Sequence, residues 1–154
     1  MTSHVERVAA SPRVDSRHRA REAAVQMLYQ WEVGRQPLAG VLETFWTLTP
    51  GTSTPVSDEI RGFAARLATG VVDALATIDP MITETAVHWR LERMNVLDRL
   101  ILRLAIYEFL HEPETPAKVV INEALELART FGADDSVRFA NGILDAIRKT
   151  LERE

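Results

Sequence analysis

The chain of 154 residues has no cysteine, which excludes disulfide bonds and thiolate metal sites. It also has no uncharged apolar run near the roughly 20 residues that a membrane-spanning helix needs. The first dozen residues lack the apolar stretch of a secretion signal. We therefore expect a soluble cytoplasmic protein that does not enter a membrane.

Catalytic and cofactor motifs are missing as well. No HExxH, GxxxxGK[ST], GxGxxG or GxSxG pattern occurs, so a zinc protease site, a phosphate loop and a serine nucleophile have no basis. Adjacent Asp134 and Asp135 suit a helix cap better than a metal or an acid–base pair. The histidines are too far apart for a local ligand pair: His4, His18, His88 and His111. We expect no enzyme activity, no cofactor and no metal.

Alternating strand patterns are absent, whereas apolar residues recur at helical spacing along the chain. The sequence therefore predicts an all-α protein of about seven helices. Asp15 or Ser16 could cap the first helix, Ser57 opens the third, and a further helix starts at Asp79–Pro80. Gly132 suits a left-handed position after the sixth helix. The Pro-, Gly- and Thr-rich segment 48–56 is predicted to be a loop.

The segment 95–111 is apolar on most of its circumference, which places it in the middle of the fold. Three polar residues, Arg103, Tyr107 and Glu108, interrupt it. Neither helix propensity nor core packing requires polar groups at these positions.

Several segments together resemble the NusB family of bacterial transcription antitermination factors. They are DRLILRLAIYEFL from Asp98, PAKVVINEALELARTFGADDSVRFANGILD from Pro116, ARE at 20–22 and LYQ at 28–30. The resemblance covers about residues 17–147. It implies two small helical bundles sharing a central hydrophobic helix, within a domain over residues 15–154 that follows a flexible extension, 1–14.

Charge is distributed unevenly along the chain. Residues 1–21 contain five arginines and two acidic residues, whereas the rest contains 13 basic and 20 acidic residues. A local basic arm can follow a phosphate backbone even on an acidic protein. On the residues alone, an RNA-binding arm and an ordinary solvated tail both remain open.

The resemblance implies that the arginine-rich N-terminus holds single-stranded boxA RNA. Aromatic residues near it would stack bases, an interaction worth about 1–3 kcal/mol each. The RNA-binding positions that match the family are Arg17, His18, Arg19, Arg21, Tyr29 and Phe139, and we add Arg13 and Arg138 as further phosphate contacts. His18 stands where some relatives have a further arginine, and Arg13 could compensate. Core packing of Tyr29 and Phe139, and a solvated Arg138, are the alternatives.

The resemblance also implies a protein partner, the small-subunit ribosomal protein NusE. Asp98 and Asp135 are the matching positions, and both suit a basic partner. Helix N-terminal acids favoured by the dipole are the alternative. Asn122, Glu123 and Asn141 also fit the family pattern, but we expect them to form a structural hydrogen-bond network.

Taken together, we expect a transcription antitermination factor that binds boxA RNA of rRNA leader transcripts with NusE. It would couple that RNA to the elongating RNA polymerase complex with other Nus factors. One alternative is a helical interaction module, such as a homodimer, that uses exposed Phe45 and Trp46 and binds no RNA. A domain fused to an RNA methyltransferase is a third, but the chain has no glycine-rich methyl-donor site.

Overall fold

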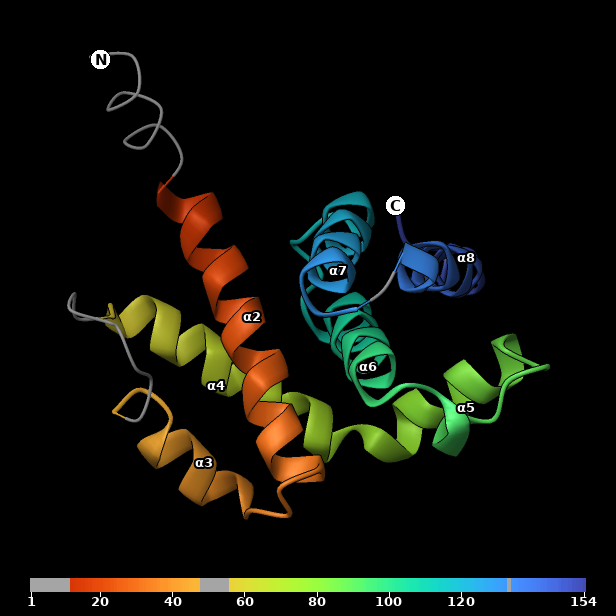
Figure 1. Ribbon diagram of the computed structural model, residues 1–154. Coiled ribbons are helices and arrows are strands. Elements are labelled where there is room, and N and C mark those ends of the chain that lie inside the picture. The colour runs from red at the N-terminus through yellow and green to blue at the C-terminus, as the bar shows by residue number, and fades with distance from the viewer. Residues whose placement is uncertain (1–11, 48–55, 133) are drawn as a thin grey trace.

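The computed structural model describes residues 12–47, 56–132 and 134–154, which form helices and turns without a strand (Figure 1). The elements are α2 (Pro12–Glu32), α3 (Leu38–Thr44), α4 (Asp58–Asp73), α5 (Leu75–Thr85), the short 3-10 helix η1 (Leu91–Arg93), α6 (Val96–His111), α7 (Ala117–Phe131) and α8 (Asp134–Thr150). The all-α prediction is confirmed. Most of the predicted loop 48–56 lies outside the described residues, as do residues 1–11 of the predicted extension.

Helix α6 is the centre of the molecule. Figure 1 shows α2, α3 and α4 to the left of α6, with α5 and α8 to its right and α7 above it. Helices α2 and α4 pack on α6, and so do α5, α7 and α8. Every residue from 100 to 109 is buried. The predicted pair of small bundles sharing a central helix is therefore confirmed.

Two helix starts follow from side-chain caps. The Ser57 hydroxyl accepts a hydrogen bond from the backbone N–H of Ile60 at 3.3 Å, as predicted for the start of α4. The Asn95 side chain accepts from the N–H of Leu97 at 2.9 Å and starts α6. The predicted cap of the first helix is wrong, because α2 already begins at Pro12.

The boundary between α4 and α5 also differs from the prediction. Helix α4 ends at Asp73, and Ala74 leaves helical geometry with φ −102° and ψ 10°. Helix α5 begins at Leu75 and continues through Pro80. Fully buried Ile78 and Ile82 lie one turn apart on either side of the proline. Their packing offsets the backbone hydrogen bond that proline cannot donate.

Two glycines allow close approaches rather than unusual backbone angles. A Cβ on Gly70 would overlap the ring of Tyr107, so glycine lets α4 pack closely on α6. Gly132 has φ −118°, which makes the prediction of a left-handed residue wrong. A Cβ there would lie 2.8 Å from the hydroxyl of Ser136 and 2.9 Å from the carbonyl oxygen of Ala128. The tight passage from α7 to α8 explains this glycine.

A polar cluster around the buried Arg103 joins the two bundles. Arg103 on α6 forms two hydrogen bonds to the carboxylate of Asp79 on α5, both 2.9 Å, and one to Glu32 on α2 at 2.8 Å. Arg99 also pairs with Glu32. Burial alone would raise the pKa of Glu32, but hydrogen bonds from Arg103 and Arg99 outweigh it and lower that pKa. The arginine within the apolar helix is thus part of the fold.

Candidate nucleic-acid interface

The three predicted RNA-binding arginines with described side chains on α2 lie in three different environments. Arg17 is half-buried and its guanidinium lies 4.4 Å from the centre of the Phe63 ring. Arg19 is exposed, whereas Arg21 is only 3% exposed. Residues turn by about 100° each around a helix, so Arg19 cannot share the face of Arg17 and Arg21, which lie one turn apart. The side chain of Arg13 lies outside the described part of the structure.

Arg21 is bound inside the protein. Its Nε and Nη2 atoms donate to the two carboxylate oxygens of Glu108 on α6, each at 2.8 Å, and Nη1 donates to Glu123 on α7 at 3.3 Å. Burial alone would lower the pKa of Arg21, but its hydrogen bonds to the carboxylates of Glu108 and Glu123, together with their charges, raise it. Arg21 was predicted to bind RNA, but its guanidinium is buried in the protein and does not lie at the surface. It connects α2 to α6 and α7, and Glu108 is its buried partner.

His18 belongs to the same network. Its Nδ1 atom lies 2.9 Å from Glu123, and its Nε2 atom lies 3.5 Å from Glu22. Two carboxylates therefore flank the ring, which is about one-third exposed at 31%. Glu123 has the structural role predicted for it. Asn122 and Asn141 are exposed, so the prediction is wrong for these two amides.

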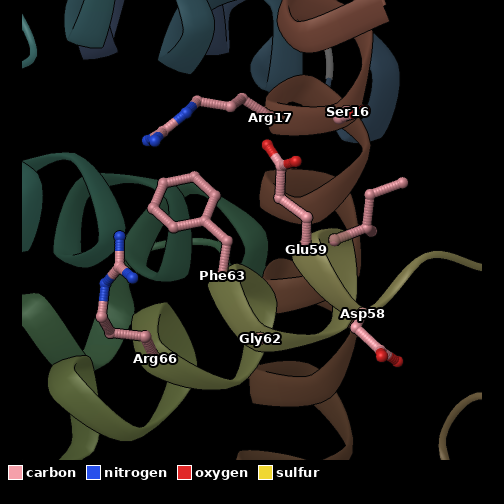
Figure 2. A pocket seen from close by; sticks show the side chains of 8 residues that line it. Ser16, Arg17, Asp58, Glu59, Gly62, Phe63 and Arg66 are labelled. Carbon is pink, nitrogen blue, oxygen red and sulfur yellow. The ribbon is translucent and has the colours of Figure 1, made fainter.

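Arg17 takes part in a pocket between α2 and α4, which we call the Phe63 pocket. It has a volume of about 350 Å³ and is lined by Ser16, Arg17, Asp58, Glu59, Ile60, Gly62, Phe63 and Arg66. Figure 2 shows Arg17 reaching the ring from α2 and Arg66 reaching it from α4, while Asp58 points away. The Arg66 guanidinium lies 4.8 Å from the ring centre. Two cations thus stack on one buried aromatic ring.

A second pocket brings together residues that the sequence assigned to two different roles. We call it the Trp89 pocket; its volume is about 420 Å³ and its lining is Trp89, Arg93, Met94, Asn95, Asp98, Asp135, Ser136 and Phe139. The rings of Trp89 and Phe139 meet edge to face, with centres 5.8 Å apart. Phe139, predicted to bind RNA, therefore lies beside Asp98 and Asp135, predicted to bind a protein. Trp89 is 60% exposed.

The other predicted residues remain at the surface. Tyr29 on α2 is 42% exposed, which is enough to offer one ring face to a base. Arg138 is 86% exposed, and its Nη2 lies 3.6 Å from an oxygen of the fully solvated Asp135. Such an exposed pair contributes little to stability, so both groups are available to a partner.

Phe63, Arg66 and Trp89 were not predicted as site residues. Phe63 has the spacing of a core residue, and it is indeed buried, so periodicity gave no sign of the arginines around it. Arg66 lies 46 positions before Glu112, its carboxylate partner. Trp89 carried the only readable signal, since it lies among polar residues in the sequence HWRLER. An aromatic residue in such a segment has no apolar stripe to join.

Within the described ranges, no group of three or more histidine, aspartate or glutamate side chains could hold a metal ion. In the same ranges no helix is both long enough and apolar enough to cross a membrane. Phe45, which the interaction-module alternative needs at the surface, is only 6% exposed. That part of the alternative is wrong, and Trp46 alone remains partly accessible.

Comparison with known proteins gives a consistent family. A sequence model of the NusB family matches residues 18–149. The transcription antitermination protein NusB of Solibacter usitatus is 44% identical over 136 residues, which cover 88% of this chain and 90% of that protein.

Solved structures agree with the fold. The NusB structure of T. maritima superimposes with a TM-score of 0.76 at 37% identity, covering 86% of this chain and 90% of that one. A structure of the antitermination factors NusB and NusE in complex with dsRNA has a TM-score of 0.75 at 21% identity, with 88% and 98% coverage. The second likeness is one of fold alone.

Proposed function

The chain belongs to the NusB family, and we propose that it is a transcription antitermination factor that binds boxA RNA together with NusE. The observation that carries this proposal is the family match over residues 18–149. Arg19, an exposed arginine on α2, lies within the matched segment. Because the 21%-identical fold relative was solved with NusE and dsRNA, both partner classes are accessible to this fold.

We assign the RNA to α2, where Arg17, Arg19 and Tyr29 are all at least partly accessible at different positions around the helix. Arginine neutralises phosphates and stacks on bases, and tyrosine offers a further stacking face. Arg21 is left out, since its guanidinium is already bound to Glu108 and Glu123. Arg138 on α8 is a further exposed cation, which we assign to the RNA as a separate phosphate contact. The acidic remainder of the protein confines the RNA to this region.

We assign NusE to the Trp89 pocket. Two carboxylates, those of Asp98 and Asp135, lie beside the exposed ring of Trp89. Ribosomal proteins are basic, so acidic groups around an aromatic anchor suit such a partner. Phe139 lies in the same pocket, and Arg138 precedes it. We therefore place NusE and part of the RNA next to each other at the Trp89 pocket.

The mechanism needs no bond chemistry. Holding nascent RNA and a second protein on one scaffold keeps that RNA near the elongating polymerase, which raises its effective concentration. A short basic arm on an acidic protein gives weak RNA binding alone. NusE then adds contacts, so we expect each ligand to strengthen binding of the other.

Fluorescence anisotropy of a labelled boxA RNA, beside a scrambled RNA of equal length, tests the proposal. We expect preference for boxA that increases when NusE is present. If about three to four phosphates are neutralised, log K should fall against log salt with a slope of about −2 to −3. Equal, weak binding to both RNAs, unchanged by NusE, would contradict the proposal and favour an interaction module.

Variants separate the two assigned surfaces. Arg19→Ala should weaken RNA binding and flatten the salt slope by about 0.7, while Arg129→Ala, also exposed, should do neither. Trp89→Ala should weaken NusE binding by tenfold or more, the usual scale of an aromatic anchor at about 1.4 kcal/mol or above. Val119→Ala, an exposed apolar residue on α7, is its control.

A further inference from the structure

The Phe63 pocket contains an arginine, Arg66, that the proposed function has not used. The buried Phe63 ring is approached by three guanidinium groups, those of Arg17, Arg66 and Arg21, at 4.4, 4.8 and 5.6 Å from its centre. Arg21 is already bound to Glu108 and Glu123. The other two converge on a solvent-accessible hollow of about 350 Å³.

Both remaining guanidinium groups keep donors for a ligand. Arg66 is 52% exposed and uses Nε and Nη2 on the buried carboxylate of Glu112, at 3.0 and 3.1 Å, which leaves Nη1. Arg17 has no hydrogen-bond or ion-pair partner among the described residues. Stacking on the ring holds each planar group in position, so less side-chain entropy is lost when a ligand binds.

The chemistry of the pocket favours a phosphate over an apolar ligand. Guanidinium groups bind phosphate oxygens through paired N–H donors, and the pocket provides such groups from two different helices. Gly62 leaves open space at its margin, where an added Cβ would meet no atom within 4 Å. Glu59 opposes an anion, since its carboxylate points toward α2 beside Arg17 (Figure 2). Replacing Glu59 therefore measures how much this opposing charge weakens the binding of an anion.

We propose that the Phe63 pocket is a second RNA subsite, in which Arg66 and Arg17 together bind a backbone phosphate as the strand passes from α2 onto α4. The inference rests on the proposed function, because it extends the path of the same RNA. Arg66 is then a binding residue, and Phe63 is a positioning residue that holds both guanidinium groups. Glu59 limits the affinity of this subsite.

Salt-dependent binding of boxA RNA with flanking nucleotides on both sides, in the presence of NusE, tests the subsite. We expect Arg66→Gln to weaken binding several-fold and to reduce the salt slope by about 0.7, the value for one phosphate on a single strand. The control is Arg61→Gln on the same helix, whose guanidinium lies 5.8 Å from the Trp46 ring instead. Arg61→Gln should bind as the unaltered protein does.

Replacing Arg66 leaves the buried Glu112 without its partner and can lower the stability of the fold. A second variant tests the subsite without this loss of stability. Glu59→Gln removes an opposing charge and should tighten RNA binding about twofold at low salt, with the gain lost at high salt. If Arg66→Gln matches Arg61→Gln in slope, or Glu59→Gln does not tighten binding, the subsite is refuted. Failure of the unaltered protein to prefer boxA would instead refute the proposed function.

Discussion

Arg17, Arg19 and Arg21 occur within five positions of α2 and have three different environments. Arg21 points into the junction of α2, α6 and α7, where Glu108 is 2% exposed and Glu123 is 18% exposed. A buried carboxylate cannot stay charged without such a partner. Arg19, two positions earlier, meets solvent and has no comparable role. At the residue scale, an arginine on this helix either holds the fold together or stays open to a ligand, and the direction of its side chain decides which.

We therefore predict that Arg21→Ala reduces the free energy of unfolding by about 3–5 kcal/mol, because it leaves Glu108 buried and unpaired. Arg19→Ala should change it by less than about 0.5 kcal/mol. Urea unfolding followed by circular dichroism measures both. Equal losses in the two variants would show that the ion pair with Glu108 does not stabilise the fold.

Replacing both partners gives a further check. The double variant Arg21→Met, Glu108→Leu should recover most of the stability lost in Arg21→Ala, since apolar groups of similar size remove the unpaired charge. No recovery would mean that the loss comes from packing of the arginine stem rather than from the charge of Glu108.

At the scale of elements, two glycines on α4 show that the effect of a residue on helix stability depends on what that part of the helix packs against. Gly70 faces the Tyr107 ring on α6, whereas Gly62, two turns earlier, faces open space. Both are interior positions of the same helix, where alanine has the higher intrinsic propensity. Their opposite surroundings allow packing and propensity to be measured separately.

We predict that Gly70→Ala lowers the free energy of unfolding by about 1–3 kcal/mol, because the new methyl group must displace Tyr107. Gly62→Ala should raise it by about 0.5–1 kcal/mol, since it restricts the unfolded chain without a clash. Thermal unfolding of both variants gives the comparison. A stabilising Gly70→Ala would mean that α4 and α6 can separate at little cost.

At the scale of the whole molecule, the ion-pair cluster of Glu32, Asp79, Arg99 and Arg103 connects α2 and α5 through the central helix α6. Its hydrogen bonds lower the pKa of Glu32 in the folded state despite burial. A carboxyl group whose pKa is lower when folded stabilises the protein above its unfolded pKa. That contribution is lost as the pH falls through the folded value.

We predict that stability falls as the pH drops below about 5, and that Glu32→Gln is less stable at neutral pH but loses less on acidification. Glu126→Gln removes an exposed ion pair with Arg129, and its stability should change with pH as that of the unaltered protein does. Urea unfolding at several pH values measures the slopes. Parallel slopes for Glu32→Gln and the unaltered protein would contradict the role of Glu32.

The helical class, the central position of 95–111 and the family were readable from the sequence, because apolar spacing and local motifs depend on near neighbours. The direction of Arg21 was not readable, since Glu108 lies 87 positions away along the chain. The same holds for Arg66 with Glu112, and for Trp89 with Phe139. Periodicity tells which face of a helix is apolar, whereas only packing decides which helix that face meets. The tertiary structure therefore decided which arginines lie at the surface and which are buried in ion pairs.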